Sequence, residues 1–259
     1  MAPSLDVMAR FAAPAHTLRG SSGPMVVHRY RRSASAGTAV VAHGRNGAAD
    51  QPQMLPIIDA CLDRSLAVVV PDLCNSGAND SAGSPADFTM AAHIADVRTA
   101  MAFAAEVEPV RRGEPLLLIG HSMGAYAAVR IAAEAAPGTI GGVLAVSPVI
   151  SGRALLAARQ AMGGGALAAL QAELPGAITE WPQHDLATVA AGFKVPCAII
   201  VGADDTLTTP HDAQTLASLL GANTVYFDVV PGEHHCPLGK DYARSVGAAL
   251  DRLLAATER

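Results

Sequence analysis

The sequence predicts an α/β fold with a mostly parallel central sheet and helices on both faces. Six short apolar runs alternate with helical patterns, at residues 38–44, 65–72, 115–122, 139–147, 195–202 and 223–230. Strands separated by helices form βαβ units, in which the strands pair in parallel. The runs are continuously apolar, which is typical of strands buried on both faces. We expect one domain over residues 1–259.

The elements between these strands have recognisable ends. A serine-proline pair at 84–85 predicts a helix that continues to residue 106. Thr209, followed by proline, predicts a helix that Gly221 closes. The last helix is expected over residues 242–257, with one charged and one apolar side. Ahead of the first buried strand, the charged segment 24–33 predicts an edge strand or hairpin.

Two segments are longer than a simple strand-helix alternation needs. Residues 71–85 form a turn-rich loop just after a predicted strand, at the sheet edge where α/β proteins bind ligands. Residues 148–194 exceed one crossover helix. They read as two short helices around the glycines at 163–165, and predict a small cap insertion around residues 149–192.

A serine stands between two glycines where the third predicted strand meets a helix. The segment is GHSMG, with Gly120, Ser122 and Gly124. A tight strand-to-helix turn strains its central residue and tolerates only small neighbours. The G-x-S-x-G pattern in this context predicts a nucleophile elbow, which exposes the serine beside the N-terminus of a helix.

A nucleophilic serine needs a base and a carboxylate that orients the base. The next strand endings supply both types, Asp204 with Asp205, and His234 with His235. A metal site built from these four residues and His211 is a weaker alternative, because the helical H-x-x-x-H spacing is absent.

Over residues 36–256 the chain resembles the α/β-hydrolase family of serine hydrolases. The likeness rests on the elbow, on Gly202-Ala203-Asp204-Asp205 after a strand, and on the segment PGEHH, residues 231–235. It implies that Ser122, Asp205 and His235 form the catalytic triad. Asp204 and His234 would then have structural roles.

The resemblance also implies an oxyanion hole made of two backbone N–H groups. Met123 follows the serine, and the His43-Gly44 turn would make Arg45 the second donor. His43 is then a residue that stabilises the turn. The Arg45 side chain either clamps a substrate carboxylate or, as we favour here, points to solvent or pairs with Asp50 or Asp72.

Other side chains are weaker candidates. Trp181 falls in the predicted cap, where it either walls the substrate pocket or packs the cap onto the core. His93 is expected to be a packing residue, and Cys74 and Cys236 to be filler.

Composition excludes several classes of function. A net charge of −5 with no basic run argues against a nucleic-acid partner. No apolar run approaches the roughly 20 residues that span a bilayer, and residues 1–20 lack the order of a secretory signal. The four scattered cysteines suit free thiols in the cytoplasm. We expect no metal and no cofactor.

These observations predict a cytoplasmic serine esterase acting on a small acyl substrate through an acyl-enzyme intermediate. Lactone, thioester or C–C bond hydrolysis would use the same triad, and a substrate panel would separate them. A cofactor-free lyase or perhydrolase would turn over simple esters poorly. A non-catalytic receptor would still bind its ligand after Ser122→Ala. The oligomeric state is left open.

Overall fold

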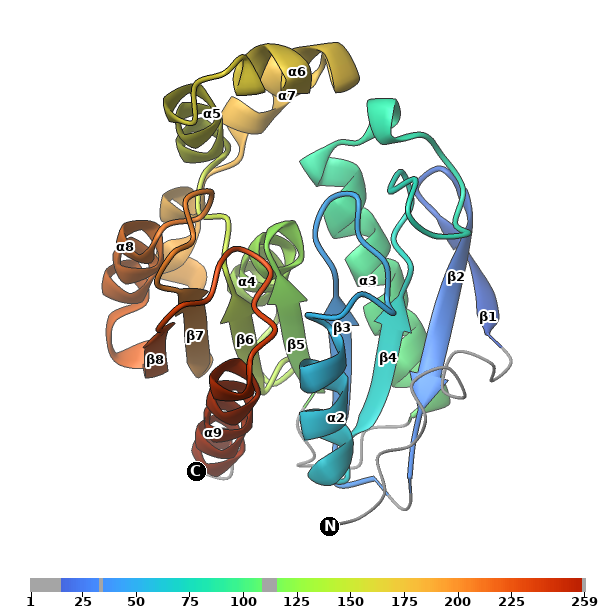
Figure 1. The fold of residues 1–259 in the computed structure, drawn as a ribbon. Helices are drawn as coiled ribbons and strands as arrows, with labels where there is room; N and C mark the ends of the chain where they lie inside the picture. The colour runs from blue at the N-terminus through green and yellow to red at the C-terminus, as the bar shows by residue number, and fades with distance from the viewer. Residues whose placement is uncertain (1–14, 33–34, 109–115, 258–259) are drawn as a thin grey trace.

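The computed structural model describes residues 15–32, 35–108 and 116–257 and contains one eight-stranded sheet (Figure 1). The strand order is β1-β2-β4-β3-β5-β6-β7-β8. The six predicted strands are all present and run parallel to one another. They are β3 (Thr38–Ala42), β4 (Ala67–Pro71), β5 (Leu116–His121), β6 (Gly142–Val146), β7 (Cys197–Gly202) and β8 (Thr224–Val230).

The N-terminal hairpin adds the two remaining strands. Strand β1 (His16–Gly20) pairs with β2 (Gly23–Tyr30), which pairs in turn with β4, and both pairings are antiparallel. The segment 24–33, predicted as an edge strand or hairpin, thus supplies one strand of a hairpin, β2, and β1 rather than this segment is the edge. The sequence did not predict strand β1, and residues 1–14 lie outside the described part of the chain.

Helices cover both faces of the sheet, as predicted. Helices α2 (Leu55–Asp63) and α9 (Lys240–Thr257) pack on one face, and α3 (Met90–Val107), α4 (Met123–Glu134) and α8 (Pro210–Leu220) on the other (Figure 1). Successive residues of a strand point to opposite faces. In β3, Val40 therefore enters one core cluster while Val41 enters the other. Strand β8 differs, since it forms the far edge and most of its residues are only half-buried.

One helix start was predicted wrongly. The Ser84 side chain caps only a short 3₁₀ turn, Pro85–Asp87. Phe88 then takes an extended backbone and is buried in the core, which interrupts the helical path. Helix α3 starts again at Met90, where the Thr89 hydroxyl accepts from the N–H of Ala92 at 3.0 Å. The signals around Thr209 and Gly221 did mark helix α8, which begins with a capping box.

Residues 152–192 form short helices and turns, of which α5, α6 and α7 lie beyond the carboxyl ends of the parallel strands (Figure 1), while Gly192 lies against Ala133 of α4. They are α5 (Gly152–Ala161), α6 (Ala166–Glu173), α7 (Ala177–Glu180) and the 3₁₀ turns Trp181–Gln183, Leu186–Thr188 and Ala190–Gly192. We call α5, α6 and α7 the cap. Across the described residues, no helix combines the length and apolar character needed to cross a bilayer.

Candidate active site

Ser122 sits on a strained turn between β5 and α4. Its φ is 57°, which places a non-glycine residue in the left-handed region. Neither flanking position has room for a Cβ atom. A Cβ on Gly120 would lie 2.2 Å from the backbone of Gly124, and one on Gly124 would lie 2.3 Å from the carbonyl oxygen of Ala42. The sequence therefore folds here only with glycine on each side of the serine.

The side chains of Ser122, His235 and Asp205 form one hydrogen-bonded chain. The Nε2 of His235 lies 3.0 Å from the Oγ of Ser122, and its Nδ1 lies 3.0 Å from Oδ2 of Asp205. These residues come from the ends of β5, β8 and β7, which meet at the carboxyl edge of the sheet. A carboxylate only accepts hydrogen bonds, so Nδ1 carries the proton and Nε2 is free to accept one from the serine.

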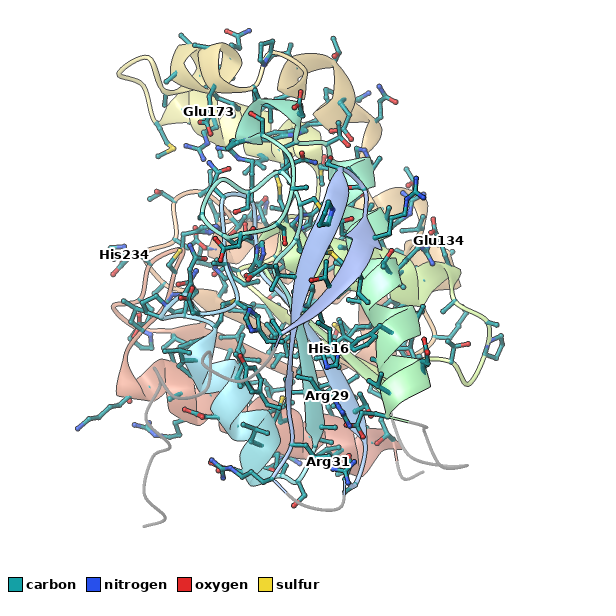
Figure 2. The ribbon with its side chains drawn as sticks, turned by 90° about the vertical axis from the view of Figure 1, so that its right-hand side faces the viewer. His16, Arg29, Arg31, Glu134, Glu173 and His234 are labelled. Atoms are coloured by element: carbon teal, nitrogen blue, oxygen red, sulfur yellow. The ribbon has the colours of Figure 1, made fainter. Side chains whose placement is uncertain are left out.

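The neighbouring acid and histidine do not join this chain. His234 is exposed and projects from the margin of the molecule (Figure 2). Its Nδ1 lies 3.2 Å from the carbonyl oxygen of Asp204. The backbone N–H of Asp204 donates to the carbonyl of Glu233. Both residues thus stabilise the turns after β7 and β8, outside the Ser122 chain.

Asp205 is held in its ionised form. Its side chain is fully buried, and burial alone would raise its pKa. The hydrogen bond and charge of His235 act against burial, together with donors from Thr208, and the pKa of Asp205 falls below its usual value. The backbone N–H groups of Leu207 and Thr208 both donate to Oδ1 at 2.9 Å. The carboxylate is therefore charged and fixed in orientation at neutral pH.

Thr208 is a member of the site that the sequence reading missed. Its Oγ1 lies 2.8 Å from Oδ2 of Asp205, 3.1 Å from Nδ1 of His235 and 3.0 Å from the carbonyl oxygen of Ser147. The hydroxyl has one proton to donate and also accepts. It therefore contacts both partners of the Asp205–His235 hydrogen bond. Its place three residues after the acid is the signal that could have revealed it.

His121, directly before the serine, was also missed. It is buried, and its Nε2 donates to the carbonyl oxygen of His235 over 2.7 Å. Burial, with a smaller effect from the nearby His235, lowers the pKa of His121 to about 4. The ring is thus neutral, and it fixes the backbone of the residue that carries the proposed base. The signal that could have revealed His121 is its place on a predicted buried strand, directly before the predicted nucleophile.

The turn after β3 lies against the serine. A Cβ on Gly44 would stand 2.9 Å from the Cβ of Ser122, so only glycine allows this approach. His43 holds the turn in place: its Nδ1 donates to the Gly44 carbonyl over 2.7 Å, and its Nε2 accepts from the N–H of Leu73 over 2.9 Å. Burial lowers the pKa of His43, which keeps it neutral.

The two backbone N–H groups predicted to bind the oxyanion belong to Met123 and Arg45. Met123 is the first residue of α4, where an N–H has no carbonyl partner within its own helix. Arg45 directly follows Gly44, the glycine that approaches Ser122. Their function in the oxyanion hole stays a prediction.

The Arg45 side chain has a partner that the sequence did not suggest. Its Nη1 lies 2.9 Å from Oε1 of Glu173, in cap helix α6, and only 12% of the side chain is exposed. It pairs with neither predicted aspartate. The Asp72 carboxylate instead bonds His28 and the N–H of Ala49. The prediction that the Arg45 side chain points to solvent or pairs with Asp50 or Asp72 was therefore wrong. Cap helix α6 supplies the carboxylate of Glu173 to it instead.

The remaining candidates lie in packed surroundings. Trp181 is 1% exposed and belongs to the core cluster, with the backbone of Gly152 pressed against it. Its packing accounts for its position, and a substrate contact stays a prediction. His93 is buried, and its Nε2 donates to the carbonyl of His43 over 3.0 Å. Within the described ranges, no cluster of three or more His, Cys, Asp or Glu side chains is suited to hold a metal.

Known proteins share this architecture. A family model described as the alpha/beta hydrolase fold matches residues 40–165. Among solved structures, the Pyrococcus furiosus esterase Pf2001 superposes with a TM-score of 0.71 at 16% identity, over 98% of this chain and 94% of that one. Est1E from Butyrivibrio proteoclasticus gives 0.71 at 12%, over 93% and 99%.

The mouse alpha/beta hydrolase domain-containing protein 10 gives a TM-score of 0.70 at 17% identity, over 94% of this chain and 99% of that one. A search of curated proteins finds no match. The family model and these structures confirm the predicted resemblance. The chain has the α/β-hydrolase fold.

Proposed function

We propose that the protein is a serine hydrolase that cleaves a small carboxylic ester through an acyl-enzyme intermediate. The observation that carries the proposal is the chain of two 3.0 Å contacts that links Ser122 through His235 to the buried, ionised Asp205. This arrangement prepares a serine for attack on a carbonyl carbon. That the similar Pf2001 is named an esterase favours an ester over other acyl bonds.

In the proposed mechanism each group has one task. Ser122 Oγ attacks the carbonyl carbon while His235 Nε2 takes its proton. Asp205 holds the ring orientation and stabilises the imidazolium that forms. Met123 and Arg45 donate backbone N–H groups to the oxyanion, each contributing about 3 kcal/mol in the transition state. His235 then protonates the leaving alcohol, and a water attacks the acyl-enzyme by the same route. No step calls for a metal or a cofactor.

Other reactions that use the same triad differ from ester hydrolysis in the bond that is cleaved. Lactones, thioesters and C–C bonds need the same nucleophile, so a panel of these compounds beside simple esters decides among them. A lyase or perhydrolase would leave simple esters nearly untouched. A ligand receptor would bind without covalent chemistry.

The cysteines in the described part of the chain are free thiols, which supports a reducing compartment such as the cytoplasm.

A fluorophosphonate probe tests the assignment directly. It should label the folded protein, and peptide mapping should place the label on Ser122. Ser122→Ala should abolish labelling and lower ester hydrolysis by about 10⁴-fold or more. Ser218→Ala, at an exposed serine on α8, is the matched control and should keep full labelling. A label on another serine, or none on wild-type protein, would contradict the proposal.

A further inference from the structure

The turn after β3 is held in place on both sides of Arg45. The Gly44 carbonyl accepts from Nδ1 of His43 over 2.7 Å, and the Gly47 carbonyl accepts from Nδ2 of Asn79 over 3.0 Å. Among the described residues, however, no group outside the cap forms a hydrogen bond with Arg45. The residue predicted to bind the oxyanion is therefore anchored differently from its neighbours in the turn.

The anchor of Arg45 is a carboxylate of the cap. Oε1 of Glu173, in α6, accepts from Nη1 of Arg45 over 2.9 Å and from Nδ2 of Asn46 over 2.8 Å. The hydrogen bond from Asn46, and after it that from Arg45, lowers the pKa of Glu173, so the carboxylate is charged at neutral pH. One oxygen of the cap thus binds two neighbouring side chains of the turn.

The turn lies directly against Ser122. A Cβ on Gly44 would stand 2.9 Å from the Cβ of Ser122. Asn46 has a φ of 54°, a left-handed conformation that the contacts around it must maintain. Arg45 lies between these two residues, and within the described ranges its backbone N–H has no hydrogen-bond partner. This N–H can therefore donate to an oxyanion, and its direction depends on how the turn is held.

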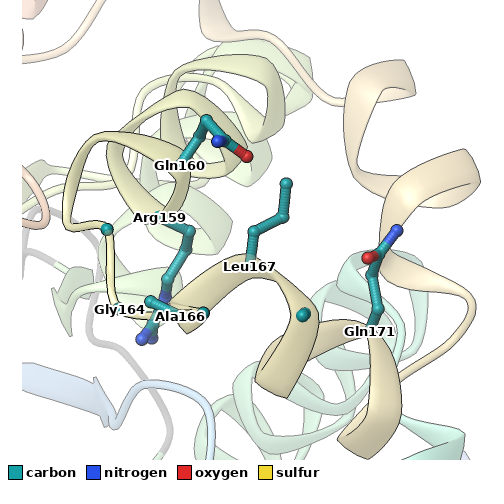
Figure 3. Close-up of a pocket in the computed structure, with 9 residues that line it drawn as sticks. Arg159, Gln160, Gly164, Ala166, Leu167 and Gln171 are labelled. Carbon is teal, nitrogen blue, oxygen red and sulfur yellow. The ribbon is translucent and has the colours of Figure 1, made fainter.

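Helix α6 has few other contacts that fix its position. It buries only Leu170, and the glycine turn at 163–165, which joins it to α5, faces open space. Between α5 and α6 lies a cavity of about 390 Å³ that is lined by residues of the cap segment alone (Figure 3). The two hydrogen bonds of Glu173 therefore hold α6 against the turn as well as the turn against α6.

We propose that Glu173 is a positioning residue of the active site, which holds the turn after β3 through Arg45 and Asn46 so that the Arg45 N–H points at the oxyanion. This inference rests on the proposed serine hydrolase function and on Arg45 as an oxyanion donor. Glu173 acts through these two side chains and not on the substrate itself. The cap then contributes to the rate of the reaction, because the direction of an oxyanion donor decides how strongly it stabilises the transition state.

Hydrolysis of p-nitrophenyl butyrate separates positioning from substrate binding. Glu173→Ala removes both hydrogen bonds and should lower kcat about tenfold, as for the loss of one hydrogen bond to a charged group, while KM stays within about twofold of wild type. Glu173→Gln keeps an acceptor without the charge, so we expect a fall of about threefold. Gln171→Ala, at an exposed position of the same helix, is the matched control and should leave kcat unchanged.

A transition-state analogue gives a second readout. Trifluoroacetophenone forms a reversible adduct with a nucleophilic serine, and the carbonyl oxygen of that adduct carries the negative charge. Its affinity should fall in Glu173→Ala by the same factor as kcat/KM.

Arg45→Met, which keeps the backbone N–H but deletes the guanidinium, should lower kcat as well. In the double variant, kcat should fall by less than the product of the two single effects, because both changes remove the same contact.

The outcomes separate the two proposals. Fluorophosphonate labelling of Ser122 together with an unchanged kcat in Glu173→Ala would overturn the positioning role while the hydrolase function stands. So would a higher KM at constant kcat, since Glu173 would then serve only to enclose the substrate, or an equal fall of kcat in Gln171→Ala. If Glu173→Ala does not fold, Glu173→Gln preserves the shape of the side chain and decides the matter. Absence of labelling and of ester hydrolysis in wild type would instead contradict the hydrolase function itself.

Discussion

The carboxyl edge of the sheet and the cap above it are built in opposite ways. At the sheet edge, Asp205 is fully buried and accepts hydrogen bonds from four donor groups on three residues. In the cap, α6 buries only Leu170, and three consecutive glycines with positive φ face open space. Several hydrogen bonds thus fix the position of Asp205, whereas packing does not fix the glycine turn of the cap.

Glycine-to-alanine changes should show this contrast most strongly. In Gly120→Ala the new Cβ would meet the backbone of Gly124 at 2.2 Å, which neither strand nor helix can relieve. We expect the loss of about 4 kcal/mol or more in the free energy of unfolding, or no folded protein. Gly163→Ala meets no atom within 4 Å and carries only the penalty of its left-handed φ of 64°, about 1 kcal/mol.

Urea unfolding of both variants beside wild type measures the difference. Equal losses of stability would mean that the turn at Ser122 tolerates rearrangement, and the contrast between the two regions would fail.

Acid should destabilise the sheet-edge region through its buried histidines. Burial lowers the pKa of His121 to about 4 and that of His93 to about 3, against about 6.5 in an unfolded chain. Between pH 7 and pH 5 the unfolded chain binds protons that the folded one excludes, so stability is full above pH 6.5 and falls as the pH falls. The expected loss by pH 5 is about 2 kcal/mol for each histidine.

Urea titrations at pH 7 and pH 5 check this expectation. His121→Gln keeps a donor towards the His235 carbonyl and removes the titrating group, so its loss between the two pH values should be smaller by about 2 kcal/mol. An identical pH dependence in wild type and variant would show that His121 is not the source.

Removal of the Thr208 hydroxyl should weaken catalysis without affecting substrate binding. Thr208→Val keeps the shape but deletes the donor to Asp205 and the contact to His235. We expect kcat to fall about tenfold with KM nearly unchanged, as for the loss of one hydrogen bond to a charged group. Thr208→Ser retains the hydroxyl and should restore most of the rate. A purely structural role would predict instead that serine rescues neither kcat nor stability.

The smallest effect on stability is expected where cap helix α7 contacts helix α3. Oε1 of Glu180 accepts from the N–H of Ala91 at 3.2 Å, in the first turn of α3, and from Nε2 of His184 at 2.6 Å. Glu180→Gln weakens the attraction to the helix N-terminus and should cost about 0.5 kcal/mol. Thermal unfolding at low salt would detect it, with Glu106→Gln on exposed α3 surface as control. An equal shift in the control would point to net charge alone.

The sequence predicted what depends on local pattern. Continuous apolar runs located every parallel strand, and the two glycines around Ser122 located the turn because no other residue fits there. Asp205 and His235 could be chosen only through a family resemblance, since the residues alone left their neighbours open. The structure brings these two, and not Asp204 or His234, into the Ser122 chain.

What the sequence could not predict depends on contacts between distant segments. Arg45 and Glu173 are far apart in the chain, and no local pattern pairs a turn after β3 with a cap helix. The helix expected from Ser84 begins instead at Met90, because Phe88 is drawn into the core. Thr208 gained its place only once the ends of β6, β7 and β8 were assembled.

The order of the proposed triad along the chain has a consequence for how activity arises during synthesis. Ser122 lies before the cap, whereas Asp205 and His235 follow it, on the last two strands to be made. A nascent chain that ends within the cap already contains the strands up to β6, the strained turn and the turn after β3. It lacks β7 and β8, and with them the base. The proposed nucleophile would thus leave the ribosome without its base, and hydrolysis would begin only after β7 and β8 have joined the sheet.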